Sequence, residues 1–123
     1  MTENETMKRV LEKAIDHYGK SNQVVKTYEE VGEFLQAMCK FTYLADRHNE
    51  WKKATSGTTS AIEDRYLFQD IEQGEKHLRE EIADCIIMFE QMRLIYGPEE
   101  VDWWINFKLE RLDDRIERGK KGV

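Results

Sequence analysis

The sequence has little proline, glycine or cysteine, and it has no long apolar run. One proline and seven glycines occur among 123 residues. The two cysteines, Cys39 and Cys85, form neither a disulfide framework nor a CxxC pair, so we expect a reduced, cytoplasmic protein. The longest apolar run, residues 85–89, is far too short to span a bilayer, and the polar N-terminal residues do not resemble a signal peptide. We therefore expect no membrane partner.

The chain is acidic overall and has no block of basic residues. The sequence holds 19 Lys and Arg against 25 Asp and Glu, which gives a net charge of −6. Such a chain binds nucleic acid poorly, so we expect no nucleic-acid partner. Apolar residues make up 40% of the chain, enough to argue against wholesale disorder. The length predicts a single domain over residues 1–123.

Helix-forming residues dominate and strand-like alternation is absent, so the predicted fold class is all-α. Four helices are expected, over residues 2–18, 21–46, 75–96 and 98–118. Thr2 is a candidate N-cap, Gly19 and Gly97 are stop signals, and Pro98 suits the first position of the last helix. Residues 47–71 are expected to form a variable region, with an exposed loop followed by a short helix or turn.

Two of the expected helices each carry a pair of acids at i and i+3, namely Glu30 with Glu33 and Glu81 with Asp84. On a helical wheel Glu30 and Glu81 fall inside apolar arcs, whereas Glu33 and Asp84 lie at the edges. The arcs consist of Phe34, Ala37, Met38, Phe41, Leu44 and Ala45 on the earlier helix and of Leu78, Ile82, Cys85, Ile86, Met88, Phe89 and Met92 on the later one. The spacing therefore predicts four carboxylates that face one another.

Four converging carboxylates need a cation or protons, because burying isolated charge is costly and like charges repel. Oxygen-only ligands select hard cations, so Mg²⁺ is the first expectation and Mn²⁺ the second. Mg²⁺ commonly bridges to phosphates, which indicates a phosphorylated substrate. A di-iron site is disfavoured because His17, His48 and His77 all lack a Glu three residues earlier. The alternative is that the acids are merely tolerated on amphipathic helices.

The last expected helix places a stripe of one indole and three cations beside its apolar arc. The stripe consists of Trp104, Lys108, Arg111 and Arg115, and the arc of Val101, Ile105, Leu109, Leu112 and Ile116. We interpret the stripe as a phosphate-binding surface with an aromatic platform. The alternative is a flank of long cations paired with nearby acids. Trp103 and Phe107 lie on another side, which indicates a partner surface, most simply for a second copy of the chain, or packing under residues 47–71.

Two further residues share a face with the acids. Gln23 precedes Glu30 by seven residues and is a candidate for reading a base edge; it is equally consistent with an ordinary N-terminal helix residue. Lys40 follows Glu33 by seven residues and is a candidate phosphate contact, or it merely balances the acids.

These motifs resemble those of the all-α nucleoside triphosphate pyrophosphohydrolases, the MazG-like superfamily, especially its small single-domain members. The similarity covers residues 14–19, 23, 29–34, 80–84, 87–92 and 107–112. It implies a four-helix bundle completed by assembly into a homodimer or homotetramer, with the site near the subunit boundary. It also implies Mg²⁺ bound by Glu30, Glu33, Glu81 and Asp84. Residues 47–71 match no pattern, so the base stays open.

The resemblance further implies hydrolysis of a nucleoside or deoxynucleoside triphosphate between its α and β phosphates. Lys108 and Arg111 would contact phosphate, with Arg115 helping to neutralise the leaving pyrophosphate. Glu33, at the rim, is our candidate to orient or deprotonate the attacking water. Two rival hypotheses are a non-enzymatic helical module that binds a nucleotide or protein, and a purely structural helical assembly.

Overall fold

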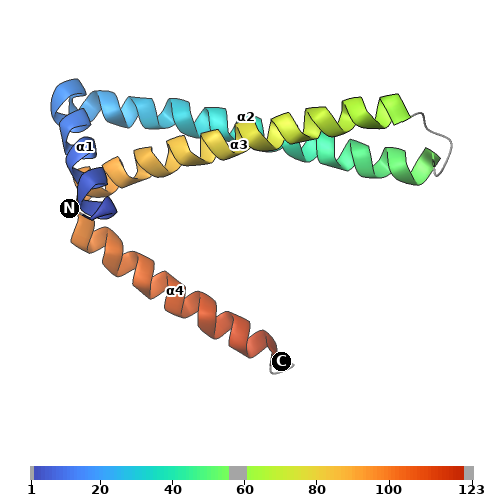
Figure 1. Cartoon of the computed structure of the whole chain (residues 1–123). Coiled ribbons are helices and arrows are strands. Elements are labelled where there is room, and N and C mark those ends of the chain that lie inside the picture. The colour runs from blue at the N-terminus through green and yellow to red at the C-terminus, as the bar shows by residue number, and fades with distance from the viewer. Residues whose placement is uncertain (1, 56–60, 121–123) are drawn as a thin grey trace. The chain divides into compact units, whose positions relative to one another are not determined.

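The computed structural model describes residues 2–55 and 61–120, with side-chain positions for all of these except 3, 51, 52, 54, 55 and 61–67. Within this part the chain forms four α-helices and no strand (Figure 1). The helices are α1 (Glu3–Tyr18), α2 (Lys20–Thr55), α3 (Ala61–Tyr96) and α4 (Pro98–Lys120). The all-α prediction is therefore confirmed. No described helix combines the length and apolarity needed to cross a membrane.

The predicted helix boundaries near glycine and proline are confirmed. The Thr2 hydroxyl accepts a hydrogen bond from the Glu5 amide at 3.2 Å, and the Thr2 amide donates to Glu5 Oε2 at 3.0 Å, a capping box that starts α1. Gly19 and Gly97 adopt φ values of 90° and 112°, which only glycine reaches without strain, and they follow the ends of α1 and α3. Pro98 begins α4 as expected.

The loop expected at the start of residues 47–71 is wrong in its described part, because α2 continues to Thr55. The short helix expected after the loop is the first part of α3, which begins at Ala61. No proline or glycine interrupts residues 47–55, and most of their side chains tolerate a helix, so an established helix can propagate through them. The centre of the expected loop, residues 56–60, lies outside the described residues. At the other end of the chain, α4 runs past its expected end at residue 118 and ends at Lys120.

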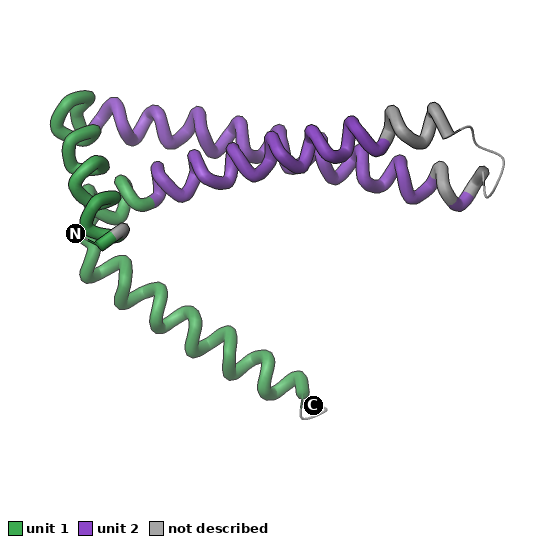
Figure 2. The backbone as a smooth tube through the Cα atoms, viewed as in Figure 1, with its two compact units in different colours: residues 1–20, 90–123 green, residues 21–89 purple. Residues whose placement is uncertain are grey.

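The hairpin of α2 and α3 makes up one compact unit, residues 21–89, in which the two helices lie side by side (Figures 1 and 2). Buried and half-buried positions alternate at spacings of three and four residues, as in a coiled-coil seam. We call this series of positions the seam. On α2 it consists of Gln23, Thr27, Glu30, Phe34, Ala37, Phe41, Leu44 and His48, and on α3 of Ile71, Gly74, Leu78, Glu81, Cys85 and Met88. Each helix thus carries one glutamate in its seam.

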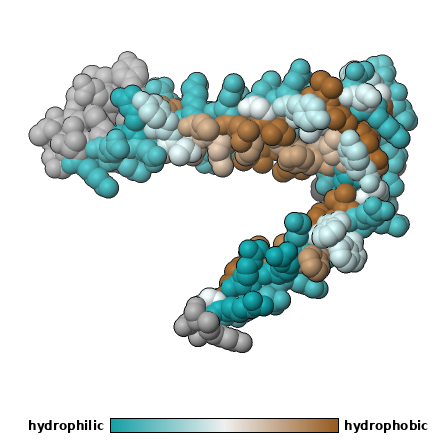
Figure 3. Space-filling view, turned by 180° about the vertical axis from the view of Figure 1, so that it is seen from behind, coloured by the Kyte–Doolittle hydropathy of each residue, from teal (hydrophilic) through white to brown (hydrophobic). Residues whose placement is uncertain are grey.

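The predicted apolar arc of α3 is wider than the seam that α2 covers. Ile82, Ile86 and Phe89 remain 39, 53 and 55% exposed, and Met38 on α2 is 44% exposed. One neighbouring helix covers only two of seven heptad positions, so the rest of the arc stays on the surface of the chain. Apolar side chains accordingly form a band along the hairpin (Figure 3).

The second compact unit combines residues 1–20 and 90–123 (Figure 2). Arg93, near the end of α3, pairs with Glu90 at 3.0 Å and with Asp102 of α4 at 3.3 Å. None of the described residues of α4 is buried. The expected core arc of this helix is therefore not a core within the chain: Val101 is half-buried and the other four members are exposed. The predicted four-helix bundle and its oligomerisation stay predictions.

Candidate metal centre

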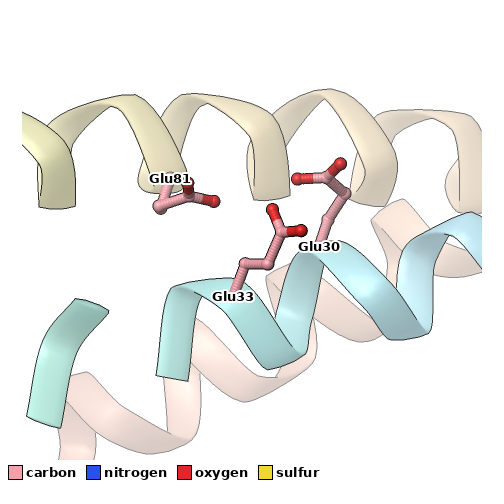
Figure 4. A group of neighbouring side chains, drawn as sticks. All are labelled: Glu30, Glu33 and Glu81. Carbon is pink, nitrogen blue, oxygen red and sulfur yellow. The ribbon is translucent and has the colours of Figure 1, made fainter. Parts of the chain in front are cut away.

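Three carboxylates from the two helices of the hairpin converge at the middle of the seam. Glu30 and Glu33 come from α2 and Glu81 from α3, and one carboxylate oxygen of each lies within 4.8 Å of the others (Figure 4). Glu30 and Glu81 are 9 and 7% exposed, whereas Glu33 is exposed. The prediction that two acids point inward and that Glu33 lies at the rim is confirmed.

Each buried glutamate has one oxygen that the protein leaves without a partner. Among the described residues, neither Oε2 of Glu30 nor Oε2 of Glu81 has a hydrogen-bond partner, although both atoms are buried. A buried unpaired polar atom is destabilising, and it is more so when it carries charge. Hard oxygen donors with free lone pairs, gathered from two helices, are the ligands that Mg²⁺ and Mn²⁺ prefer. The donor set therefore fits a divalent cation.

The other oxygen of each buried glutamate faces a basic side chain one turn earlier on its own helix. Lys26 Nζ lies 3.3 Å from Glu30 Oε1 and 3.2 Å from Glu29 Oε2, and His77 Nε2 lies 3.7 Å from Glu81 Oε1. The hydrogen bonds to Glu29 and then to Glu30 raise the pKa of the Lys26 ammonium. Sequence reasoning did not single out either basic residue in this role. Their i−4 spacing from the inward acids is the signal that could have found them.

Burial and crowded negative charge both act on the carboxyl of Glu81. Burial raises the pKa of this carboxyl, and the charges of Glu33, Asp84 and Glu30 raise it further, whereas His77 lowers it. An uncompensated carboxylate is therefore disfavoured at this position. A bound cation would reverse that preference, because positive charge stabilises the ionised form.

Asp84, the fourth predicted ligand, is exposed and is not among the three acids that gather within 4.8 Å. Its charge nevertheless acts on Glu81, so it lies near the cluster. Its role as a ligand stays a prediction.

The two cysteines differ in their surroundings. Cys85 is buried in the seam and its thiol donates to the Glu30 carbonyl at 3.5 Å; burial, and then the acids, raise the pKa of this thiol. It is therefore a neutral packing group and a poor nucleophile. Cys39, by contrast, is an exposed residue of α2.

The predicted substrate-binding residues occupy both units. In the hairpin, Gln23 is buried in the seam and its carbonyl accepts a hydrogen bond from the Thr27 hydroxyl at 2.8 Å, and Lys40 lines a surface cavity. In the other unit, the three cations of the stripe line one hollow of about 530 Å³ on α4: Lys108, Arg111 and Arg115. Their role in binding phosphate stays a prediction.

The aromatic side chains of α4 contact one another. Trp104 is exposed and packs edge-on against Trp103 at 4.9 Å between ring centroids. Trp103 in turn stacks on Phe107 at 5.4 Å, and the Arg111 guanidinium lies 5.9 Å from the Phe107 ring centre. Of these residues, Trp103 and Phe107 form the surface that the sequence assigns to a partner, and that assignment also stays a prediction.

Comparisons of the chain found no matching protein-family model, no matching curated protein and no matching solved structure. The family resemblance thus rests on the sequence motifs alone. The case for a function rests on the geometry of the three carboxylates.

Proposed function

We propose that this protein hydrolyses a nucleoside or deoxynucleoside triphosphate between the α and β phosphates, with Mg²⁺ or Mn²⁺ as cofactor. One observation carries the proposal: two buried carboxylates on different helices, each with an unpartnered oxygen, meet a third carboxylate at the rim. A seam that served only packing would be more stable with apolar residues at these two positions.

Glu30 and Glu81 would hold the cation, because the seam fixes both side chains. Glu33 at the rim is the proposed third ligand, and Asp84, close by and exposed, is the proposed fourth. The chemistry that Mg²⁺ supplies in such sites is neutralisation of phosphate charge and a lowered pKa of water. Within the described part of the chain, Oε2 of Glu30 and Oε2 of Glu81 have no hydrogen-bond partner, and a bound cation would supply one to each.

Glu33 is the proposed base. Its side chain is exposed, so it can reach a water molecule that enters from solvent. The carboxylate would orient this water and take its proton. The water oxygen forms a bond to the α-phosphorus while the bond from that phosphorus to the α–β bridging oxygen breaks, and pyrophosphate leaves with the bridging oxygen. The products are a nucleoside monophosphate and pyrophosphate.

The basic stripe of α4 is the proposed counterpart for the phosphates. Lys108, Arg111 and Arg115 line a single hollow, and three cations suit the charge of a triphosphate. Trp104 beside them would offer a ring face to the sugar. The exposed apolar side chains of α3 and α4 support assembly into a homodimer or homotetramer. This scheme agrees with the resemblance to MazG-like pyrophosphohydrolases.

The test is release of pyrophosphate from a panel of nucleoside and deoxynucleoside triphosphates, with Mg²⁺, with Mn²⁺ and with EDTA. We expect metal-dependent release, with the monophosphate as second product. Glu30→Gln and Glu81→Gln should abolish turnover. The outward neighbour of Glu81 provides a matched control, because Glu80→Gln loses the same charge and should keep activity.

Two results would contradict the proposal. One is turnover that survives EDTA, or that survives substitution of the inward acids at a near wild-type rate. The other is an absence of release from every nucleotide by a folded protein that binds Mn²⁺, which would favour a module that binds a nucleotide or a protein without turnover.

A further inference from the structure

A cavity of about 460 Å³ opens on the hairpin beside the carboxylate cluster. From α2 it receives an apolar wall of Ala37, Phe41 and Leu44, and from α3 it receives Gln73 and Asp70. Its volume is in the range of small-molecule pockets, and it has their usual combination of an apolar wall with a few polar groups.

His77 connects this cavity to the proposed metal centre. Its side chain lines the cavity, and its Nε2 lies 3.7 Å from Glu81 Oε1. On the opposite helix, Ala37 lies one turn after Glu33, and Lys40, which also lines the cavity, lies one turn further. The cavity and the carboxylates are therefore adjacent parts of one surface of the hairpin.

Gly74 lines this cavity, although the fold does not require a glycine at this position. It is half-buried inside α3, where glycine is less favourable than alanine, and its backbone is helical. A Cβ atom at this position would meet Phe41 Cδ2 at 3.6 Å and Leu44 Cδ1 at 3.7 Å, which are ordinary van der Waals contacts. Neither close packing nor an unusual backbone angle requires the glycine. Because Gly74 lines the cavity, a side chain at this position would reduce the space in it.

We propose that this cavity binds the nucleobase of the substrate and that Gly74 sets the space available to it. The inference rests on the proposed function, since it assigns the nucleoside end of the same substrate. The apolar wall offers the Phe41 ring to the face of a base. The Gln73 amide both donates and accepts hydrogen bonds, and Asp70 accepts them, so these groups can read a base edge. Gly74 and Glu81 are seven residues apart, about 10 Å along the helix, which an extended nucleotide spans.

The test uses a variant that fills the cavity and a control that adds the same side chain elsewhere. Gly74→Leu places a side chain between Phe41 and Leu44. Gly119→Leu is the matched control, because a Cβ there meets nothing within 4 Å. The full-length proteins are titrated calorimetrically, in Mg²⁺, with the α,β-methylene analogues of ATP, GTP, CTP and UTP and with inorganic tripolyphosphate, which lacks a base.

We expect Gly74→Leu to weaken binding of the preferred analogue by about tenfold or more, the loss of one base–aromatic contact, while tripolyphosphate binding changes less than about twofold. Gly119→Leu should alter neither. Gly74→Ala adds only a methyl group, which fits, so it should weaken binding of the analogue by a smaller factor. Circular dichroism shows whether Gly74→Leu is folded. If it is not, Gly74→Ala alone provides the test.

The outcomes separate this inference from the proposed function. Analogue affinity that is unchanged in both Gly74 variants, or an equal loss for analogue and tripolyphosphate, overturns the assignment of the cavity even if nucleotides are hydrolysed. Failure of the wild-type protein to bind any analogue overturns it as well. A selective loss of analogue binding in a protein that hydrolyses no nucleotide would support the cavity and refute the hydrolysis.

Discussion

Replacing Gly74 by alanine should stabilise the protein, because the structure offers room for the added methyl group. Alanine is favoured over glycine inside a helix by about 1 kcal/mol. The Cβ would also contact Phe41 and Leu44 at 3.6 and 3.7 Å. A fully buried methyl group contributes about 0.8 kcal/mol, and at this half-buried position we expect about half of that. The free energy of unfolding should therefore rise by about 1.4 kcal/mol.

Gly32→Ala separates the two contributions. Gly32 is also inside a helix of the hairpin, but it is exposed and a Cβ there meets nothing within 4 Å. This variant should gain the helix contribution of about 1 kcal/mol and no contact contribution. Urea unfolding followed by circular dichroism, at one protein concentration, measures both variants, and each kcal/mol corresponds to about 3–5 °C in Tm. A destabilised Gly74→Ala protein would refute the reasoning, since the glycine would then be required for packing.

Three further predictions concern single side chains. In EDTA, Glu81→Gln should stabilise the protein by an amount that grows as the pH rises above 4.5, the ordinary pKa of the carboxyl. The pKa of Glu81 is raised in the folded protein, so the wild type loses stability between pH 4.5 and that raised value, whereas the glutamine variant does not. Urea unfolding at several pH values checks this, and a gain independent of pH would contradict it. Lys26→Met should tighten Mn²⁺ binding about three- to tenfold in calorimetry, because Nζ lies 3.3 Å from Glu30 Oε1; unchanged affinity would count against a cation at Glu30. Thr2→Ala should lower the free energy of unfolding by about 1 kcal/mol, because the capping box with Glu5 is lost, and an unaltered urea midpoint would show that the cap contributes nothing.

The sequence predicts the inward acids well, because the seam repeats every three and four residues. That period fixes the face on which Glu30 and Glu81 lie, whatever the helices contact. Helix ends at Gly19, Gly97 and Pro98 are equally local features and are predicted correctly. These are properties of a few neighbouring residues.

Features that depend on contacts with other parts of the chain are predicted less well. The polar composition of residues 47–55 indicates a loop, but nothing in it stops a helix that is already formed. The arc containing Ile82 and Phe89 shows which side of α3 is apolar, whereas the number of helices that cover it decides how much is buried. Lys26 and His77 lie at recognisable i−4 positions, but the cavity beside Gly74 depends on the register of the two helices, which no local pattern contains.

The measurement that tests the carboxylate centre most directly is a titration with Mn²⁺ followed by electron paramagnetic resonance. We predict that the wild-type protein binds Mn²⁺, that Mg²⁺ competes for the site, and that Glu81→Gln weakens the affinity by about tenfold or more. Glu80→Gln, which removes the same charge from the next residue of α3, should bind as the wild type does. A wild-type protein that binds no Mn²⁺, or equal losses in both variants, would contradict a metal centre at Glu30, Glu33 and Glu81.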